Sequence, residues 1–365
     1  MRYFLIIFGV IFIQSSQLVA STLEIPESKL PIYRNLVMEG GGIKGIAYGG
    51  ALAELEERGI LRHITRVAGT SAGAIQASLF AIGYNAEEIT EIINTTPIES
   101  FNDDGFIVKG SKRLLKKYGW FKGDAFLQKI TELIATRTGN PNLTFAQLHQ
   151  LARSHPFRDL YVTGANLSQQ RVEVFSHETY PNMRVADAVR ISMSIPLFYE
   201  AIWLDKEGKV HEEGIACTDC SLFVDGGLLM NYPVEVFDNP KYVENSRYMR
   251  STSNYFFNEE TLGLRLERCD QIDYDIQNKH AIAPISITDF SSYTNALSTV
   301  LMRNVAPPHP RDPERTIYIN DLGMSSKVRK VPQEEKEMLM LSGRQGVYEF
   351  LGRLEERLVL RNENE

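Results

Sequence analysis

The chain has 365 residues, of which 43% are hydrophobic and 23% are charged, and its formal net charge is -7. This composition is that of a globular protein with a sizeable core. An acidic chain has no basic field to hold a phosphate backbone, so we expect no nucleic-acid partner.

A signal peptide is predicted over residues 1–20. Arg2 precedes an apolar run that ends at Ile13, and a polar stretch then leads to the small residue Ala20. This order is typical of a secretory signal, and the apolar run is shorter than the roughly 20 residues that a membrane span needs. We therefore expect a secreted or periplasmic protein in which residues 21–34 lead into the folded part. An uncleaved N-terminal anchor is the alternative.

From residue 35 onward, short β-type runs alternate with helical patterns, which indicates parallel strands joined by crossover helices and so an α/β fold. Strands are predicted over 35–39, 64–68, 160–164, 171–175, 262–266 and 316–319. Helices are predicted over 46–58, 72–82, 85–93, 144–152, 185–193, 293–302 and 333–358.

A glycine-rich turn follows the first predicted strand and reads Gly40-Gly41-Gly42-Ile43-Lys44-Gly45. Adjacent glycines let several backbone N–H groups face one point, which suits an oxyanion or a phosphate. The spacing also satisfies the G-x-G-x-x-G pattern of dinucleotide-binding proteins, but that pattern requires an acidic residue at the end of the next strand. Val67-Ala68-Gly69 stands there instead, so we expect an oxyanion site and no nucleotide cofactor.

The next motif, Gly69-Thr70-Ser71-Ala72-Gly73, matches G-x-S-x-G where a predicted strand turns into a predicted helix. A serine on such a sharp turn exposes its hydroxyl, and glycines such as Gly69 and Gly73 are needed because backbone atoms come close together there. The N–H groups at the start of the following helix can stabilise an oxyanion. The pattern predicts a nucleophile at Ser71, and a serine that merely caps the helix is the alternative.

A third motif, Asp225-Gly226-Gly227, follows an apolar run that ends at Val224. An aspartate at a strand end, followed by glycines that permit a tight turn, can be directed into a shared cleft, although an ordinary Asp-Gly turn is the alternative. Ligand sites in open α/β sheets lie at the carboxyl ends of parallel strands. We therefore expect all three motifs to converge at that edge of one parallel sheet.

Together, the three motifs resemble those of the patatin-like phospholipase family. The segment 40–45 is similar to its oxyanion segment, 69–73 to its nucleophile elbow and 225–227 to its catalytic turn. The segment 192–196, Ser-Met-Ser-Ile-Pro, resembles the small-residue segment before the aspartate in that family. The resemblance implies a three-layer α/β/α fold with a mainly parallel sheet. It also implies a catalytic domain over 35–240 and a C-terminal extension over 241–365 that packs on this domain or completes it.

The resemblance further implies a lipid acyl hydrolase of the phospholipase A or lysophospholipase type that needs neither a metal nor an organic cofactor. Ser71 would attack the acyl ester and form an acyl-enzyme, while Asp225 accepts the serine proton. The glycine turn would bind the oxyanion, and Lys44 would reinforce its field or hold the turn in place. A phospholipid or other acyl lipid would be the substrate, with transient association to the membrane surface. The sequence leaves open whether a protein activator exists.

Two other interpretations use the same residues. An ordinary α/β-hydrolase would combine Ser71 and Asp225 with a later histidine, and His280 and His309 lie in the required order. That fold places several strands before its nucleophile, whereas a single predicted strand precedes residue 64, so the two-residue mechanism is favoured. A non-catalytic lipid-binding module would keep the fold without turnover, although both reactive residues are present.

The connection from Pro196 to Asp225 is longer than relatives in this family often use, so it could form a lid or a partner site. Its Cys217 and Cys220 could form a local disulfide or stay as thiols. Without a second cysteine pair or neighbouring histidines they do not match a zinc site. Some apolar residues could form a lipid-facing rim, but core packing is expected for most of Ile107, Val108, Trp120, Phe121 and Trp203.

Overall fold

The computed structural model describes residues 31–211, 217, 219–245, 256–277, 279, 281–305 and 309–364. The predicted signal peptide at 1–20 and most of the predicted lead segment at 21–34 lie outside these residues. In the described part of the chain, none of the helices combines the length and the apolar character that a bilayer span requires.

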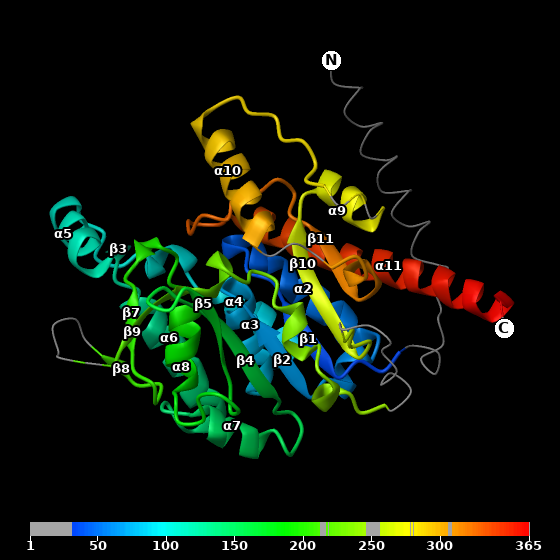
Figure 1. Cartoon of the computed structure of the whole chain (residues 1–365), viewed down its shortest axis with the longest axis horizontal. Helices are drawn as coiled ribbons and strands as arrows, with labels where there is room; N and C mark the ends of the chain where they lie inside the picture. The colour runs from blue at the N-terminus through cyan, green and yellow to red at the C-terminus, as the bar shows by residue number, and fades with distance from the viewer. Residues whose placement is uncertain are drawn as a thin grey trace.

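A mixed sheet forms the centre of the molecule (Figure 1). Its strands are β1 (Asn35–Met38), β2 (Arg66–Gly69), β4 (Asp159–Asn166), β5 (Arg171–Phe175), β7 (Ile202–Leu204), β8 (Val210–His211), β9 (Ser221–Asp225), β10 (Thr261–Glu267) and β11 (Thr316–Asn320). Their order is β11-β10-β1-β2-β4-β9-β7-β8, with β5 also paired to β4. The strands from β11 to β4 are parallel, and the others are antiparallel to their neighbours. The predicted α/β fold with a mainly parallel sheet is confirmed.

Helices connect and flank the strands. The α-helices are α2 (Ala47–Glu57), α3 (Ala72–Ala81), α4 (Ala86–Thr95), α5 (Ile107–Lys117), α6 (Asp124–Thr138), α7 (Phe145–Leu151), α8 (Val185–Ser192), α9 (Cys269–Ile276), α10 (Phe290–Val305) and α11 (Gln333–Asn364). The 3-10 helices are η2 (Gly42–Ile46), η3 (Ile60–His63), η4 (Ile98–Phe101), η5 (Gly226–Leu228), η6 (Val234–Phe237), η7 (Pro240–Tyr242) and η9 (Asp312–Glu314). The helices α5, α6 and α9 were not predicted. The predicted capping box of α7 is confirmed, since the Gln147 amide donates to Thr144 Oγ1 at 3.3 Å.

The two faces of the sheet carry cores of different size. Along β1, Leu36 and Met38 point into the larger core and Val37 into the smaller one, because side chains alternate across a strand. Helices α2, α3, α4, α6, α8 and α11 contribute to the larger core, and residues of η6 and η7 contribute to the smaller one. The strand ends that carry the three motifs are therefore held between packed layers.

The C-terminal third of the chain contributes two strands to one side of this sheet. β10 pairs in parallel with β1, with Met38 opposite Leu264, and β11 pairs with β10. β1, which carries the glycine turn, is therefore an interior strand with a neighbour on each side. The position of the glycine turn depends on chain segments more than 200 residues away.

The long helix α11 packs against α2 through glycines. A Cβ at Gly50 would overlap the carbonyl group of Met340, and one at Gly343 would overlap the carbonyl oxygen of Ala47. The two backbones therefore touch directly, and an added methyl group meets main-chain atoms that no side-chain rotation can move. The glycines set the spacing between the two helices.

The substitution Gly50→Ala is expected to lower the free energy of unfolding by about 2 kcal/mol, because overpacking against a backbone outweighs the roughly 1 kcal/mol gain in helix propensity. The matched control is Gly49→Ala in the same helix, whose Cβ would meet the Thr90 hydroxyl at 3.1 Å and could be accommodated by side-chain movement. Urea unfolding of both variants measures the difference. Equal stability of the two variants would contradict the proposed backbone contact.

Candidate active site

The glycine turn and the serine turn lie side by side at the carboxyl ends of β1 and β2. These strands are parallel neighbours, with Met38 opposite Gly69, so the turns that follow them open at the same edge of the sheet. A Cβ at Gly45 would lie 2.8 Å from the Cβ of Ala72. The structure thus brings these two predicted motifs into direct contact.

Asp225 approaches the site from the opposite direction, which corrects the expectation that all three motifs follow parallel strands. β9 is antiparallel to β4, with Asp225 opposite Gly164. It still reaches the site because β9 ends at Gly164 of β4. This residue is only two positions after Val162, which lies opposite Gly69 in β2. Gly226 packs against Thr163 there, without room for a Cβ. The three motifs therefore meet because β9 ends at this point of β4.

Ser71 sits on a sharp turn in an unusual backbone conformation. Its φ is 52° and its ψ is -122°, a region that non-glycine residues rarely adopt. A Cβ at Gly69 would overlap the carbonyl of Gly73, and one at Gly73 would overlap the carbonyl of Met38. The two glycines of the motif are therefore required by close backbone approach, as expected for a nucleophile elbow.

The glycine turn presents two backbone N–H groups that have no hydrogen-bond partner among the described residues, those of Gly41 and Gly42. Its other amides are engaged: Gly40 donates to the carbonyl of Asn231 at 3.0 Å, and Lys44 donates to that of Gly41 at 3.2 Å. Gly42 has a φ of +56° and no room for a Cβ beside Ser326. The free amides are the donors that an oxyanion would use.

Lys44 joins the glycine turn to the segment that follows β11. Its Nζ lies 2.8 Å from Asp321 Oδ2, just beyond the end of β11. The Ile43 amide donates to the carbonyl of Ser326 at 3.4 Å, in the same segment. Of the two roles left open by the sequence, this contact favours the second, in which Lys44 positions the glycine turn.

The Asp225 carboxyl group is buried, and its side chain is 5% exposed. Burial raises its pKa to about 7, while hydrogen bonds from the Ser71 side chain and the Gly227 amide oppose the rise. The Gly227 amide donates to Oδ1 at 2.7 Å, and the Asp225 amide donates to the carbonyl of Ser194 at 2.9 Å. Asp225 is therefore both the cap of an Asp-Gly turn and a carboxyl group directed at the serine hydroxyl.

Three supporting residues were not identified as such from the sequence. Asn231 Nδ2 donates to the carbonyl of Gly40 at 3.0 Å, so this side chain joins the aspartate loop to the glycine turn. Ser192 Oγ accepts from the Ser71 amide at 2.9 Å. Thr70 Oγ1 donates to the carbonyl of Met230 at 2.9 Å. A polar residue six positions after the aspartate was the available signal for Asn231, and Ser192 lay in a segment already noted for its small residues.

An apolar pocket begins at Ser71 and continues between α3, α4 and α6. Gly42, Gly45 and Ala72 border it beside the serine, and its lining contains no carboxylate group among the described residues. The apolar side chains farther along it are Ile75, Leu79, Ile92, Ile93, Ile98, Phe101, Phe126, Ile130 and Leu133. A hydrocarbon chain fits this lining, with its polar end at Ser71.

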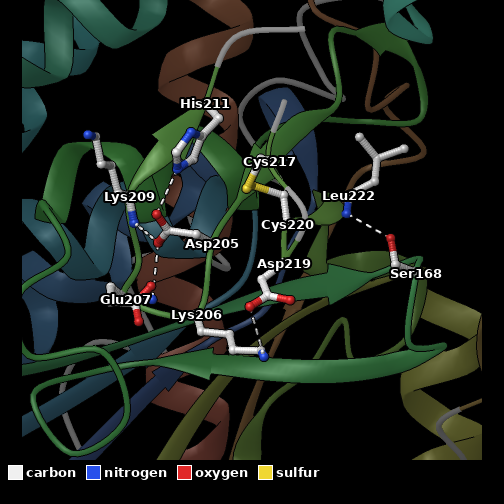
Figure 2. Close-up of a disulfide and its surroundings, with 10 residues drawn as sticks. All are labelled: Ser168, Asp205, Lys206, Glu207, Lys209, His211, Cys217, Asp219, Cys220 and Leu222. Atoms are coloured by element: carbon white, nitrogen blue, oxygen red, sulfur yellow. Dashed lines mark hydrogen bonds and ion pairs between the residues drawn. A yellow bond between two sulfur atoms is a disulfide. The ribbon is translucent and has the colours of Figure 1, made fainter. Parts of the chain in front are cut away.

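Cys217 and Cys220 form a disulfide just before β9, as Figure 2 shows. His211 lies close enough for its ring nitrogen and the two sulfurs to share a ligand site, and its Nε2 is 2.6 Å from Asp205 Oδ2. The expectation that no histidine lies beside the cysteine pair is therefore wrong. In the disulfide, both sulfurs are already bonded to each other, so they are not thiolate ligands in this state.

A second group of possible ligands, His149, Asp159 and His177, lies at the opposite end of the sheet from Ser71. Asp159 begins β4, whereas the catalytic motifs meet near the end of β2. His149 Nδ1 is 2.7 Å from Asp159 Oδ1, and the two imidazole rings stack 3.8 Å apart. Parallel stacked rings do not direct two lone pairs at one point between them, so this arrangement is not that of a formed metal site.

Several proteins of known sequence are similar to this chain. The uncharacterized protein YqhO of Bacillus subtilis is 33% identical, over 58% of this chain and 68% of its own length. The uncharacterized protein R571 of Acanthamoeba polyphaga mimivirus is 30% identical, over 59% of this chain and 64% of its own length. The probable lipid hydrolase 463L of Invertebrate iridescent virus 6 is 22% identical, over 61% of this chain and 71% of its own.

Among solved structures, VipD from Legionella pneumophila has a similar fold, with a TM-score of 0.53 and 18% identity, covering 88% of this chain and 67% of that one.

A family model described as Patatin-like phospholipase matches residues 36–238. This match covers more than half of the chain and includes the glycine turn, the serine elbow and the Asp-Gly-Gly turn. The chain therefore belongs to the patatin-like phospholipase family.

Proposed function

We propose that the chain is a lipid acyl hydrolase of the phospholipase A or lysophospholipase type. The observation that carries this proposal is the position of Ser71, which lines an apolar pocket together with Gly42, hydrogen-bonds to the buried Asp225 carboxyl group, and adjoins the glycine turn with its two free amides. Family membership and a relative named as a probable lipid hydrolase support the same class of substrate. An acyl chain would occupy the pocket, and the ester carbonyl would lie at Ser71.

In the proposed mechanism, ionised Asp225 accepts the proton of the Ser71 hydroxyl while Oγ bonds to the ester carbon. The amides of Gly41 and Gly42 hold the resulting oxyanion, and each such donor typically lowers the barrier by about 3 kcal/mol. The tetrahedral intermediate collapses, the leaving alcohol takes the proton from Asp225, and an acyl-enzyme remains. Water then attacks the acyl carbon and gives a proton to Asp225, and Asp225 returns that proton to Ser71 Oγ as the bond between Oγ and the acyl carbon breaks and the fatty acid leaves.

The position of His309 supports a two-residue mechanism over a triad. Its Nδ1 accepts a hydrogen bond from the Arg311 amide at 3.2 Å, and its ring packs near Phe257. This turn precedes β11, at the amino end of the parallel strands, whereas Ser71 follows the carboxyl end of β2. The other candidate, His280, lies outside the described residues, and its replacement is a direct test.

We also propose that the protein is secreted or periplasmic. The order of residues in the segment 1–20 and the disulfide between Cys217 and Cys220 both suit an oxidising compartment. Sequencing the amino terminus of the mature protein tests this localisation. A mature terminus still at Met1 would remove the signal-peptide argument.

Replacement of Ser71 by alanine, or of Asp225 by asparagine, is expected to lower fatty-acid release from lipid by at least about a thousandfold, because each removes a group that acts in the proposed chemical step. Ser78→Ala is the matched control, since Ser78 is buried on the same helix and does not line the pocket. Product analysis by mass spectrometry measures the release. Activity that persists in both variants, or that is lost when His280 or His309 is replaced, would contradict the mechanism with Ser71 and Asp225 alone.

Labelling with a fluorophosphonate probe distinguishes a serine hydrolase from a non-catalytic lipid-binding module. An activated serine is phosphonylated, so wild-type protein is expected to be labelled at Ser71 and the alanine variant to remain unlabelled. Absence of labelling in the folded wild-type protein would favour a non-catalytic module.

The pH dependence of kcat/KM is expected to show a rising limb with a midpoint near the pKa of Asp225, about 7. Below this pH the carboxyl group is protonated and cannot accept the serine proton, so the rate falls roughly tenfold for each further pH unit. Hydrolysis of a soluble short-chain ester between about pH 5 and 9 provides the measurement. A flat profile through neutral pH would argue against Asp225 as the base.

The same carboxyl group is expected to cost stability at alkaline pH. Because its folded pKa of about 7 exceeds the unfolded value, the folded state binds more protons between these two pKa values, and stability falls as pH rises through that window. Above pH 7 the buried carboxylate lowers the free energy of unfolding by its full amount, on the order of 4 kcal/mol. Asp225→Asn should therefore exceed wild type in unfolding free energy at pH 8 but not at pH 4. Asp219→Asn, at an exposed ion pair, should change neither value.

A further inference from the structure

Helix α5 turns its large apolar side chains toward solvent. Ile107, Val108 and Leu115 are 79%, 81% and 82% exposed, and Phe106, just before the helix, is also exposed. Leu197, in the short strand β6 (Leu197–Tyr199), is exposed as well. We call these five residues the α5 surface. Figure 1 shows α5 at the edge of the molecule, projecting away from the central sheet.

The inward face of α5 consists of a glycine and a buried arginine. A Cβ at Gly110 would lie 2.7 Å from the Trp120 ring, so the helix lies directly on that ring. Arg113 is buried, donates to the carbonyls of Asp104 and Trp120, and pairs with Glu200 at 2.8 Å. These contacts fix the rotation of the helix, and the apolar residues on its other side have no place in the core.

Lysines accompany the exposed apolar residues. The sequence Ile107–Lys117 contains Lys109, Lys112, Lys116 and Lys117 and no acidic residue. Lys109 and Lys117 pair with Asp104 and Glu200. Exposed Lys112 and Lys116 have no ion-pair partner in the part of the chain that the structure describes. A positive helix on a chain of net charge -7 is a local field that attracts anionic surfaces.

The α5 surface lies next to residues that line the Ser71 pocket. Strand β3 (Gly119–Phe121), which directly follows α5, pairs with β6, with Gly119 opposite Leu197. Two neighbours of Leu197 in the chain, Ile195 and Tyr199, line the pocket together with Ser71. Phe101 at the end of η4 also lines it, five residues before Phe106. An object resting on the α5 surface would lie next to the pocket.

We propose that the α5 surface docks on the surface of an anionic lipid bilayer, with the apolar side chains inserted between headgroups and the lysines against them. This proposal rests on the proposed lipid hydrolase function, because a pocket beside a docked helix can receive an acyl chain from the bilayer. An amphipathic helix with lysines and large apolar side chains has the composition of an interfacial helix. Helix α10 also exposes Phe290 and Tyr293, but its sequence carries a single basic residue.

The test measures binding of the full-length Ser71→Ala protein to vesicles by sedimentation, so that no lipid is consumed. Vesicles contain phosphatidylcholine alone or with phosphatidylglycerol. In the Ser71→Ala background, Lys112→Gln with Lys116→Gln is expected to weaken binding to the anionic vesicles by on the order of tenfold. Ile107→Ser with Val108→Ser is expected to weaken it at least about tenfold, also at high salt, because insertion of apolar surface is not screened.

Two control variants carry single substitutions of the same kind elsewhere. Leu341→Ser removes an apolar side chain of 67% exposure from α11, and Lys279→Gln removes an exposed lysine near α9. Both controls are expected to bind as the parent protein does. The proposal is overturned if the parent does not bind anionic vesicles, or if the α5 variants bind as tightly as the controls. Concentration-dependent dimers that only the α5 variants lose would assign the surface to a second copy instead.

Activity assays separate failure of this proposal from failure of the proposed function. In the Ser71-intact background, the α5 variants are expected to hydrolyse a soluble short-chain ester as wild type does and to lose at least about tenfold in release of fatty acid from anionic vesicles. Equal loss on both substrates would mean that α5 supports the fold or the pocket and would contradict docking. Absence of all hydrolysis in wild type with vesicle binding retained would defeat the enzyme proposal alone.

Discussion

The site depends on keeping the Asp225 carboxyl group buried beside the Ser71 hydroxyl without a cation next to it. Among the described residues no lysine or arginine pairs with Asp225, and burial is the main influence on its pKa. A cation would stabilise the carboxylate and lower its pKa, whereas burial keeps the pKa near neutral, as the proposed role of a base that accepts and returns a proton requires. Hydrogen bonds from Ser71 and Gly227 limit the rise, so the group can still ionise.

The geometry of the sheet makes this placement possible. β1 and β2 deliver the glycine amides and the serine from one direction, and β9 delivers the carboxyl group from the other. Side-chain and backbone hydrogen bonds then join the three turns: Asn231 to Gly40, and the Asp225 amide to Ser194. Because Ser192, two residues earlier, accepts a hydrogen bond from the Ser71 amide, the segment 192–194 at the end of α8 holds the backbone of both Ser71 and Asp225. A change at this segment would shift both partners together.

The sequence could identify the glycine turn and the serine elbow because each is a short, contiguous motif. The carbonyl of Gly73 leaves no room for a side chain at Gly69, four residues earlier, so this constraint appears within the motif itself, whereas the side chain at Gly73 is excluded by the backbone of Met38 in the neighbouring strand. The direction of β9 could not be read in this way, since parallel and antiparallel pairing depend on distant strands and leave the same apolar run. The role of Asn231 likewise depends on a partner 191 residues away.

Helix α5 illustrates a different limit. Sequence patterns assign apolar residues to the core because that is the usual distribution, and core packing was expected for most of a set of residues that included Ile107 and Val108. In the structure the Trp120 ring and two carboxylates occupy the inward side, so Gly110 and Arg113 face in and the apolar residues face out. The periodicity of a sequence defines the two faces of a helix, but the residues that pack against the helix decide which face is buried.

The C-terminal third of the chain shapes the glycine turn although the family match ends at residue 238. Glu39, immediately before the turn, accepts the Leu266 amide at 2.9 Å, and its carboxylate lies 3.5 Å from buried Arg265 in β10. The contacts of Lys44 with Asp321 and of Ile43 with Ser326 hold the other side. A buried ion pair adds little stability of its own but makes loss of either partner costly. The free amides of Gly41 and Gly42 are therefore positioned by residues that lie outside the three sequence motifs.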